Sequence, residues 1–267
     1  MRDSLNSSRF LKTGFFGSEE FLFLKCVRKL IKKKESGSMI SIIKNYSGML
    51  VMALGKTILL TLLALLFAMV IGMIFALMNV SRKRILNCIG MIYVDAVRGV
   101  PLIVLAFFIY FGVPSGIQQL GKSLDIAAFE QFRLTALQGG TIALAMNCGA
   151  YMAEIIRAGI QSVDKGQMEA ARSLGLTYGK SMRLIVIPQA IKTMIPSIIN
   201  QFIITLKDTS ILSVIGFTEL TNVGKTIANN TFKVLETWTV IAVFYMVVIV
   251  SLSKMAKRIE RSLSRER

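Results

Sequence analysis

Histidine is absent from this chain of 267 residues, and cysteine is scarce. The three cysteines, Cys26, Cys88 and Cys148, are odd in number and lack the spacing of metal ligands. Zinc chemistry and serine–histidine catalysis need imidazole or clustered thiolate groups, so the composition excludes both. We expect no catalytic residues, no metal site and no cofactor held by the chain itself.

Acidic residues are also few, because 15 aspartates and glutamates oppose 32 lysines and arginines, for a formal charge of +17. The positive charge is divided among loops and tails without interleaved aromatic residues, so we expect no nucleic-acid partner. Hydrophobic residues make up 54% of the chain, and the mean hydropathy is +0.61. Apolar runs that cross a bilayer, separated by basic loops, explain both values. The sequence therefore predicts an all-α membrane protein in contact with lipid.

We predict five membrane spans, at about residues 50–80, 92–116, 134–158, 184–206 and 236–256. The fourth contains Pro188, Lys192 and Pro196, so we expect a kinked helix that other protein segments cover. Residues 209–217 are apolar but too short to span a membrane, which favours a re-entrant or interfacial segment.

Residues 1–38 form a basic N-terminal extension with nine lysines or arginines and four acidic residues. No signal-peptide cleavage pattern follows it. Two interpretations stay open: a basic segment that is disordered or lies on the membrane surface, or a natural start at Met39. We favour the second, in which the extension is not native.

The distribution of basic residues predicts the orientation of the spans. The loops on one side, with the C-terminal tail, carry 14 lysines and arginines, whereas the loops on the other side carry five. The positive-inside rule places the first group, which includes residues 165–183 and the C-terminus, in the cytoplasm. The basic N-terminus opposes this orientation unless the chain starts at Met39.

A short polar segment lies between the third and fourth spans. It reads Glu169-Ala170-Ala171-Arg172-Ser173-Leu174-Gly175 and is followed after nine residues by Ile185-Val186-Ile187-Pro188. Apolar residues at three-residue spacing predict a short amphipathic helix within residues 166–175. Gly175 should end this helix, because a residue without Cβ readily takes a positive φ. Such a helix suits a groove on a partner protein, and an ordinary solvated connector is the alternative.

This pattern resembles the EAA loop of bacterial ABC importer permeases, with Ile187 where leucine is usual. Over about residues 48–261 the chain is similar to the membrane subunits of polar amino acid ABC importers of the histidine, glutamine and arginine type. The further matching stretches are Arg98–Leu102, Asn147–Arg157, Pro188–Ala190 and Leu206–Ser210. Cys148 departs from the family pattern, in which a small hydroxyl residue is common. The resemblance implies a five-helix type I permease core with a cytoplasmic coupling helix, in the bacterial cytoplasmic membrane.

The resemblance also implies partners and cargo. The chain would pair with a second permease copy or a sister subunit, with a cytoplasmic ATPase dimer that binds ATP and magnesium, and with an external amino-acid-binding protein. The cargo would be a polar L-amino acid, with glutamine favoured and arginine and cystine as alternatives. A secondary transporter or a membrane adaptor without an ATPase stays open, although the spans show no internal repeat.

Candidate site residues follow from the same resemblance. Glu169, Ala170, Ala171, Ser173, Leu174 and Gly175 would couple the chain to the ATPase. Asn147, Glu154 and Arg157 would line the substrate pathway, with Glu154 attracting the substrate ammonium; an internal Glu154–Arg157 ion pair is the alternative. Lys207 and Asp208 would form an outer gate or an exposed charge pair. Asp95 and Arg98 are expected to form a structural pair at the inner mouth.

Gly116 to Ser123 matches the phosphate-loop pattern G-x-x-x-x-G-K-S. A functional phosphate loop follows a strand and has an acidic magnesium ligand nearby. This stretch instead follows a membrane span, on the face predicted to lie outside, where ATP is absent. We therefore expect that the chain does not hydrolyse ATP.

Overall fold

The computed structural model describes residues 36–81 and 83–264, which form helices without a β-strand among them. In chain order the helices are α2 (Ser36–Val80), α3 (Arg84–Gly99), α4 (Leu102–Phe107), η1 (Phe108–Gly112), α5 (Val113–Leu124), α6 (Ala127–Glu130), α7 (Ala136–Gln161), α8 (Lys165–Ser173), α9 (Tyr178–Ser181), η2 (Met182–Val186), α10 (Ile187–Asp208), η3 (Thr209–Ile215), α11 (Leu220–Thr231) and α12 (Val234–Ser264). The extension predicted for residues 1–38 lies outside the described residues except for its last three, which begin α2.

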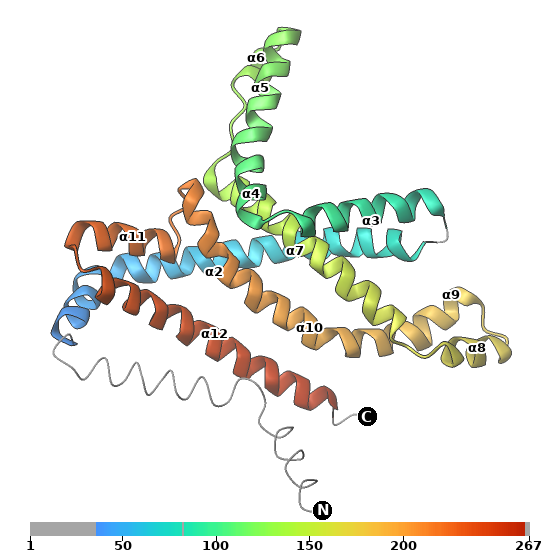
Figure 1. Ribbon diagram of the computed structural model, residues 1–267. Coiled ribbons are helices and arrows are strands. Elements are labelled where there is room, and N and C mark those ends of the chain that lie inside the picture. Colours follow the sequence, from blue (N-terminus) through green and yellow to red (C-terminus); the bar gives the residue numbers. More distant parts are fainter. Residues whose placement is uncertain (1–35, 82, 265–267) are drawn as a thin grey trace, which may run out of the picture.

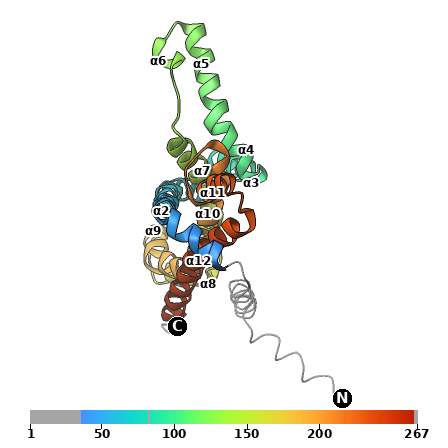
Figure 2. The ribbon, with the colours of Figure 1, turned by 90° about the vertical axis from the view of Figure 1, so that its left-hand side faces the viewer.

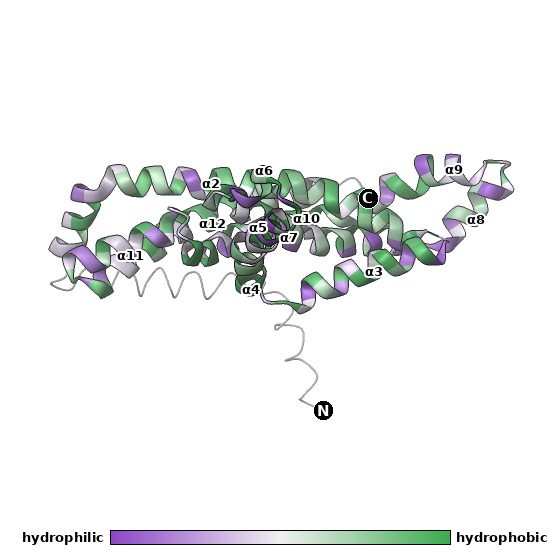
Figure 3. Cartoon of the chain, turned by 90° about the horizontal axis from the view of Figure 1, so that it is seen from above, coloured by the Kyte–Doolittle hydropathy of each residue, from purple (hydrophilic) through white to green (hydrophobic). Residues whose placement is uncertain are grey.

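The long helices α2, α7, α10 and α12 pack into an elongated bundle (Figure 1). α11 lies at one end of this bundle, and α8 and α9 lie at the opposite end. α4, η1 and α5 form an arm that leaves the bundle and turns back at α6, as both side views show (Figures 1 and 2). Hydrophobic residues prevail along the bundle, whereas hydrophilic residues are frequent on α8 and α9 (Figure 3).

Within the described part of the chain, four helical stretches are long and apolar enough to cross a membrane. They are Gly37–Val80, Leu102–Leu124, Tyr178–Ile215 and Val234–Arg258. These stretches overlap four of the five predicted spans. The predicted third span forms the 26-residue helix α7, but its glycines and its Asn147, Glu154 and Arg157 lower its hydropathy, so it falls outside this set. α7 contacts α2, α3, α4, α10 and η3, which cover it with protein.

The predicted second span, residues 92–116, is broken rather than continuous. Val100 (φ −103, ψ 130) and Pro101 (φ −56, ψ 138) are extended, so α3 ends before them and α4 begins after them. The proline ring causes this break, because it disfavours the helical conformation in the residue before it. The apolar stretch is therefore shifted to Leu102–Leu124. Within it, Gly116 to Ser123 is helical.

The predicted fourth span starts with the π-helical turn η2, and α10 continues through Pro196. A π-helical turn shifts the backbone hydrogen-bond pattern, which accommodates Pro188 because proline has no N–H to donate. Residues 209–217, predicted as a re-entrant or interfacial segment, form the 3-10 helix η3 and the turn after it. Leu212 and Ile215 of η3 are buried in the core.

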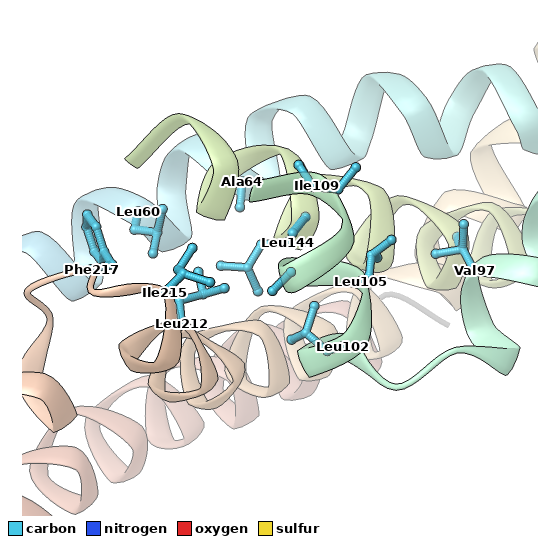
Figure 4. Close-up of a cluster of buried hydrophobic side chains, with 13 residues drawn as sticks. Leu60, Ala64, Val97, Leu102, Leu105, Ile109, Leu144, Leu212, Ile215 and Phe217 are labelled. Carbon is cyan, nitrogen blue, oxygen red and sulfur yellow. The ribbon is translucent and has the colours of Figure 1, made fainter. Parts of the chain in front are cut away.

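The main hydrophobic core lies where α2, α4, α7 and η3 meet (Figure 4). Leu60, Leu144 and Leu212 from three of these elements are fully buried in it. α2 and α7 approach each other closely, because a Cβ on Gly72 would lie only 2.6 Å from the Cβ of Met152. Small residues at helix crossings allow such an approach in membrane bundles.

Candidate functional site

α8 is a short helix with well-defined ends at one extremity of the bundle. Asp164 caps its start, since its Oδ1 accepts a 2.6 Å hydrogen bond from the Gly166 N–H. At its end the Gly175 N–H donates to the Arg172 carbonyl (3.0 Å) and the Leu176 N–H donates to the Ala171 carbonyl (3.2 Å), which is a Schellman motif. Gly175 has a φ of 85°, so the prediction that it ends the helix is confirmed.

The predicted ATPase-coupling residues divide into an exposed set and one buried residue. Glu169, Ala170, Ser173, Leu174 and Gly175 are exposed, and Leu174 retains 83% of its accessible surface. Ala171 is only 4% exposed, because α8 packs against α9 and η2 on this side. Of the two alanines predicted to contact the ATPase, only Ala170 is therefore accessible to a partner. The exposed face leaves room for a docking subunit.

Glu154 on α7 is the centre of a charged cluster. It accepts hydrogen bonds from Arg157 Nη2 and from Arg157 Nε, the latter at 3.2 Å. Arg98 Nη1 of α3 lies 4.0 Å from Glu154 Oε2, and the Arg98 guanidinium sits 5.3 Å from the ring centre of Tyr151. The internal Glu154–Arg157 ion pair, the alternative to a substrate role, is therefore present.

The predicted Asp95–Arg98 pair is wrong. No ion pair joins the two within residues 36–81 and 83–264, and Arg98 is turned toward Glu154 and Tyr151 of α7 instead. Helix spacing brings Asp95 and Arg98 to one side of α3, but packing of α3 against α7 offers Arg98 a carboxylate and an aromatic face. Asp95 itself is exposed.

A pocket of about 470 Å³, lined by both polar and apolar residues, lies between α3, α7 and α10. Its polar lining comes from Arg98 of α3, Asn147 and Tyr151 of α7, and Gln201 and Asp208 of α10. It thus joins residues predicted for three separate places, since Arg98 was expected at an inner mouth, Asn147 in the pathway and Asp208 at an outer gate. Arg98 and Asp208, which carry opposite charges, thus line the same pocket.

Other predicted site residues lie outside this pocket. Glu154 and Arg157 do not line it, although Glu154 holds the Arg98 side chain that does. Lys207 lines a separate groove between α10 and α12, so the adjacent Lys207 and Asp208 point to different places. No ion pair between Lys207 and Asp208 occurs in the described part of the chain.

Gln201 is a pocket residue that the sequence reasoning missed. Its side chain is only 5% exposed. A signal was present, because Gln201 lies seven residues before Asp208, two helical turns away on the same face. An uncharged amide in an apolar span at that spacing could have been grouped with Asp208.

Glu219, also missed, joins α11 to α12 at the end of the bundle opposite α8. Its carboxylate accepts hydrogen bonds from the Thr221 N–H (2.8 Å), the Asn222 N–H (2.7 Å) and the Tyr245 hydroxyl (2.8 Å). The side chain is fully buried at the start of α11. Burial raises the pKa of Glu219, and the hydrogen bonds from Thr221, Tyr245 and Asn222 oppose this rise in part.

Residues 68–265 match the family described as binding-protein-dependent transport system inner membrane component. The chain belongs to this family. The identification of an ABC importer permease from the EAA-like loop is thereby confirmed, as is the all-α permease architecture. Membership in this family of transport components decides against the secondary-transporter and adaptor alternatives.

Curated relatives cover most of the permease chain. It is 38% identical over 210 residues to the probable glutamine ABC transporter permease protein GlnM of Bacillus subtilis. The matched region covers 77% of this chain and 91% of GlnM. It is 34% identical over 207 residues to the glutamine transport system permease protein GlnP of Escherichia coli K12 (78% and 89%). The arginine transport system permease protein ArtQ of B. subtilis is 33% identical over 210 residues (79% and 90%).

Solved structures share the permease fold. A crystal structure of an amino acid ABC transporter with histidines matches with a TM-score of 0.75 and 39% identity, covering 84% of this chain and 98% of that one. An inward-facing structure of the MetNI methionine ABC transporter matches with a TM-score of 0.66, covering 82% and 98%. The second is 18% identical, so it supports the fold alone.

Proposed function

We propose that this permease carries a polar L-amino acid, glutamine in the first place, across the cytoplasmic membrane, and that ATP hydrolysis by separate subunits drives the transport. The observation that carries this proposal is the pocket whose lining includes both Arg98 of α3 and Asp208 of α10. A zwitterionic amino acid has a carboxylate for the guanidinium and an ammonium for the carboxylate. The relatives named for glutamine and arginine support the same cargo class.

Asp208, rather than Glu154, is the residue we assign to the substrate ammonium. Glu154 is engaged by Arg157 and Arg98 and does not line the pocket. Its role in this proposal is to hold the Arg98 guanidinium in place for the substrate carboxylate. Asn147 and Gln201 add amide groups that can bond a polar side chain.

Coupling to an ATPase dimer would use the exposed face of α8. ATP and magnesium would bind to those subunits, and ATP-driven closure would carry α8 with it. Because short segments join α8 to α7 and to η2–α10, its displacement would tilt both helices and change access to the pocket. A second copy or a sister permease would complete the pathway, and an external binding protein would deliver the amino acid.

The positive-inside rule supports an orientation with α8 and the C-terminus in the cytoplasm. Leu174 gives a test, since its side chain is exposed at the tip of this loop. A Leu174→Cys variant in a background with Cys26→Ser and Cys88→Ser should react with a membrane-impermeant maleimide in inside-out vesicles only. Reaction in right-side-out vesicles would overturn the orientation.

The function is tested by uptake into proteoliposomes that contain the assembled permease, ATPase and binding protein. We expect ATP-dependent accumulation of labelled glutamine, with arginine and cystine measured in parallel. Accumulation without the ATPase subunits, or no accumulation of any amino acid with them, would overturn the proposal.

A further inference from the structure

The groove between α10 and α12 carries positive charge from both of its walls. It has a volume of about 180 Å³, and its polar lining comes from Asn200 and Lys207 of α10 and from Ser253 and Lys257 of α12. None of the described residues that line it is acidic. Lysine ammonium groups bind phosphate as point charges, and amide and hydroxyl groups add hydrogen-bond donors. The polar side of the groove is therefore suited to an anion.

The directions of the two helices bring the charged groups toward one another. α10 runs from the α8 end of the bundle toward η3, whereas α12 runs back from α11 toward the α8 end (Figure 1). Side chains on a helix lean toward the N-terminus of that helix. Lys207 and Lys257 therefore lean into the groove from opposite ends, toward Asn200 and Ser253. Two ammonium groups that converge in this way can hold a single phosphate.

The rest of the groove is apolar and lies within the membrane part of the chain. Its lining includes Ile204 and Ile249, one from each helix. Both helices belong to stretches that are long and apolar enough to cross a membrane, Tyr178–Ile215 and Val234–Arg258. Lys207 and Lys257 are exposed, so the groove opens onto the surface of this chain. A small soluble anion would leave the apolar wall uncovered, whereas a lipid with an anionic head group matches both halves.

We propose that this groove binds one anionic phospholipid, whose phosphate lies between Lys207 and Lys257 and whose acyl chain lies along Ile204 and Ile249. The lipid bridges α10 and α12. A zwitterionic phospholipid fits less well, because its head group brings a cation close to the two lysines. The site adjoins the pocket that contains Arg98 and Asp208, since Ile204 lines both, but the inference holds whichever amino acid is carried.

Lipid binding to the purified permease–ATPase complex can be counted by native mass spectrometry, with phosphatidylglycerol and phosphatidylcholine titrated separately. We expect phosphatidylglycerol to bind about tenfold more tightly than phosphatidylcholine. Lys207→Gln and Lys257→Gln should each weaken phosphatidylglycerol binding by about tenfold, as for a lost charged hydrogen bond. Lys254→Gln is the matched control and should bind like the wild type, because Lys254 is exposed on the same helix but does not line the groove.

A second substitution tests the apolar half of the groove without changing its charge. Ile249→Trp fills the space assigned to the acyl chain, so it should also weaken phosphatidylglycerol binding. Thermal melts show whether this variant folds, and Ile249→Phe replaces it if it does not. Glycerol 3-phosphate, which has the head-group phosphate but no acyl chain, should not displace the bound lipid.

Three results would overturn the inference. Equal affinities of the wild type for the two lipids, or equal binding by all three lysine variants, would make the groove an unselective lipid contact. Displacement by glycerol 3-phosphate would make it a site for a soluble anion. Displacement by glutamine would make it part of the substrate pathway. In each case the proposed function stands or falls separately, on ATP-dependent uptake into proteoliposomes.

Discussion

The hydroxyl of Tyr245 on α12 donates a 2.8 Å hydrogen bond to Oε2 of Glu219, the residue that caps α11. The same hydroxyl lies 3.1 Å from Oγ1 of Thr221. These bonds tie the last long helix to the segment between η3 and α11, at the end of the bundle away from α8 (Figure 1). The buried carboxylate thus acts as a junction between two elements that are otherwise joined by apolar packing.

Replacing Tyr245 with phenylalanine removes one of the three donors to this carboxylate. We expect Tyr245→Phe to destabilise the protein by about 1–3 kcal/mol, because a buried acceptor loses its partner. Tyr46→Phe is the control, since Tyr46 packs on the same apolar cluster while its hydroxyl makes no hydrogen bond with the described residues. Thermal unfolding in detergent measures both, and equal melting temperatures for the two variants would contradict the prediction.

Glu219 should make stability depend on pH. Burial raises its pKa, so the folded state favours the protonated carboxyl more than the unfolded state does. Its contribution is greatest below the ordinary glutamate pKa of about 4.3 and is lost as pH rises through the raised pKa. The melting temperature of the wild type should therefore fall relative to that of Glu219→Gln across this window. If the melting temperature of the wild type instead rises relative to that of Glu219→Gln as pH increases, the three hydrogen bonds outweigh the effect of burial.

The crossing of α2 and α7 should be intolerant of a single added methyl group. A Cβ at Gly72 would meet the Cβ of Met152 at 2.6 Å and the Gly149 carbonyl oxygen at 3.1 Å, neither of which can move freely. We expect Gly72→Ala to cost about 1–3 kcal/mol of stability.

Gly55→Ala on the same helix is the matched control for Gly72→Ala. A Cβ at Gly55 meets no atom within 4 Å, so this variant should gain about 0.5–1 kcal/mol from higher helix propensity. Chemical denaturation in detergent compares the two variants, and equal stabilities would refute the close-packing argument.

Gly175 allows a separate test of the coupling proposal. No atom lies within 4 Å of a Cβ at this position, so a substitution acts through the positive φ and not through a clash. Gly175→Val should change the exit from α8 and lower the amount of substrate transported per ATP hydrolysed. Gly175→Asn should be close to wild type, because asparagine tolerates the left-handed conformation. Uptake and ATPase rates in the same proteoliposomes measure this ratio, and a normal ratio in Gly175→Val would remove the role of α8 as a lever.

Arg98 and Arg157 bind the same carboxylate but should differ in their effect on substrate binding. Only Arg98 lines the pocket, so Arg98→Gln should weaken glutamine binding by roughly tenfold, as for a lost charged hydrogen bond. Arg157→Gln should change the Kd little. Calorimetry on the permease–ATPase complex decides this, and equal losses in both variants would place Glu154 and both arginines in a purely structural cluster.

The cap of α8 and the identity of the Arg98 partner show where sequence reasoning succeeds and where it fails. The end of α8 at Gly175 was predicted correctly, because one residue without Cβ decides the local backbone. The Asp95–Arg98 pair was predicted wrongly, because spacing within α3 does not reveal which residues of a neighbouring helix Arg98 meets. In the structure, Arg98 lies against Glu154 and Tyr151 of α7. Gln201 was missed for the same reason, since its pocket exists only once α3 and α7 lie against α10.

The sequence by itself determined that the chain is a helical membrane permease with an EAA-type loop. Hydropathy, basic loops and motif spacing are local properties that can be read along the chain. Only the tertiary structure decided that Arg98, Asn147, Gln201 and Asp208 share one pocket and that α7 is covered by protein. The physical reason is that Pro101 breaks the second span and small residues bring α7 close to its neighbours, and these packing events join residues far apart in the chain.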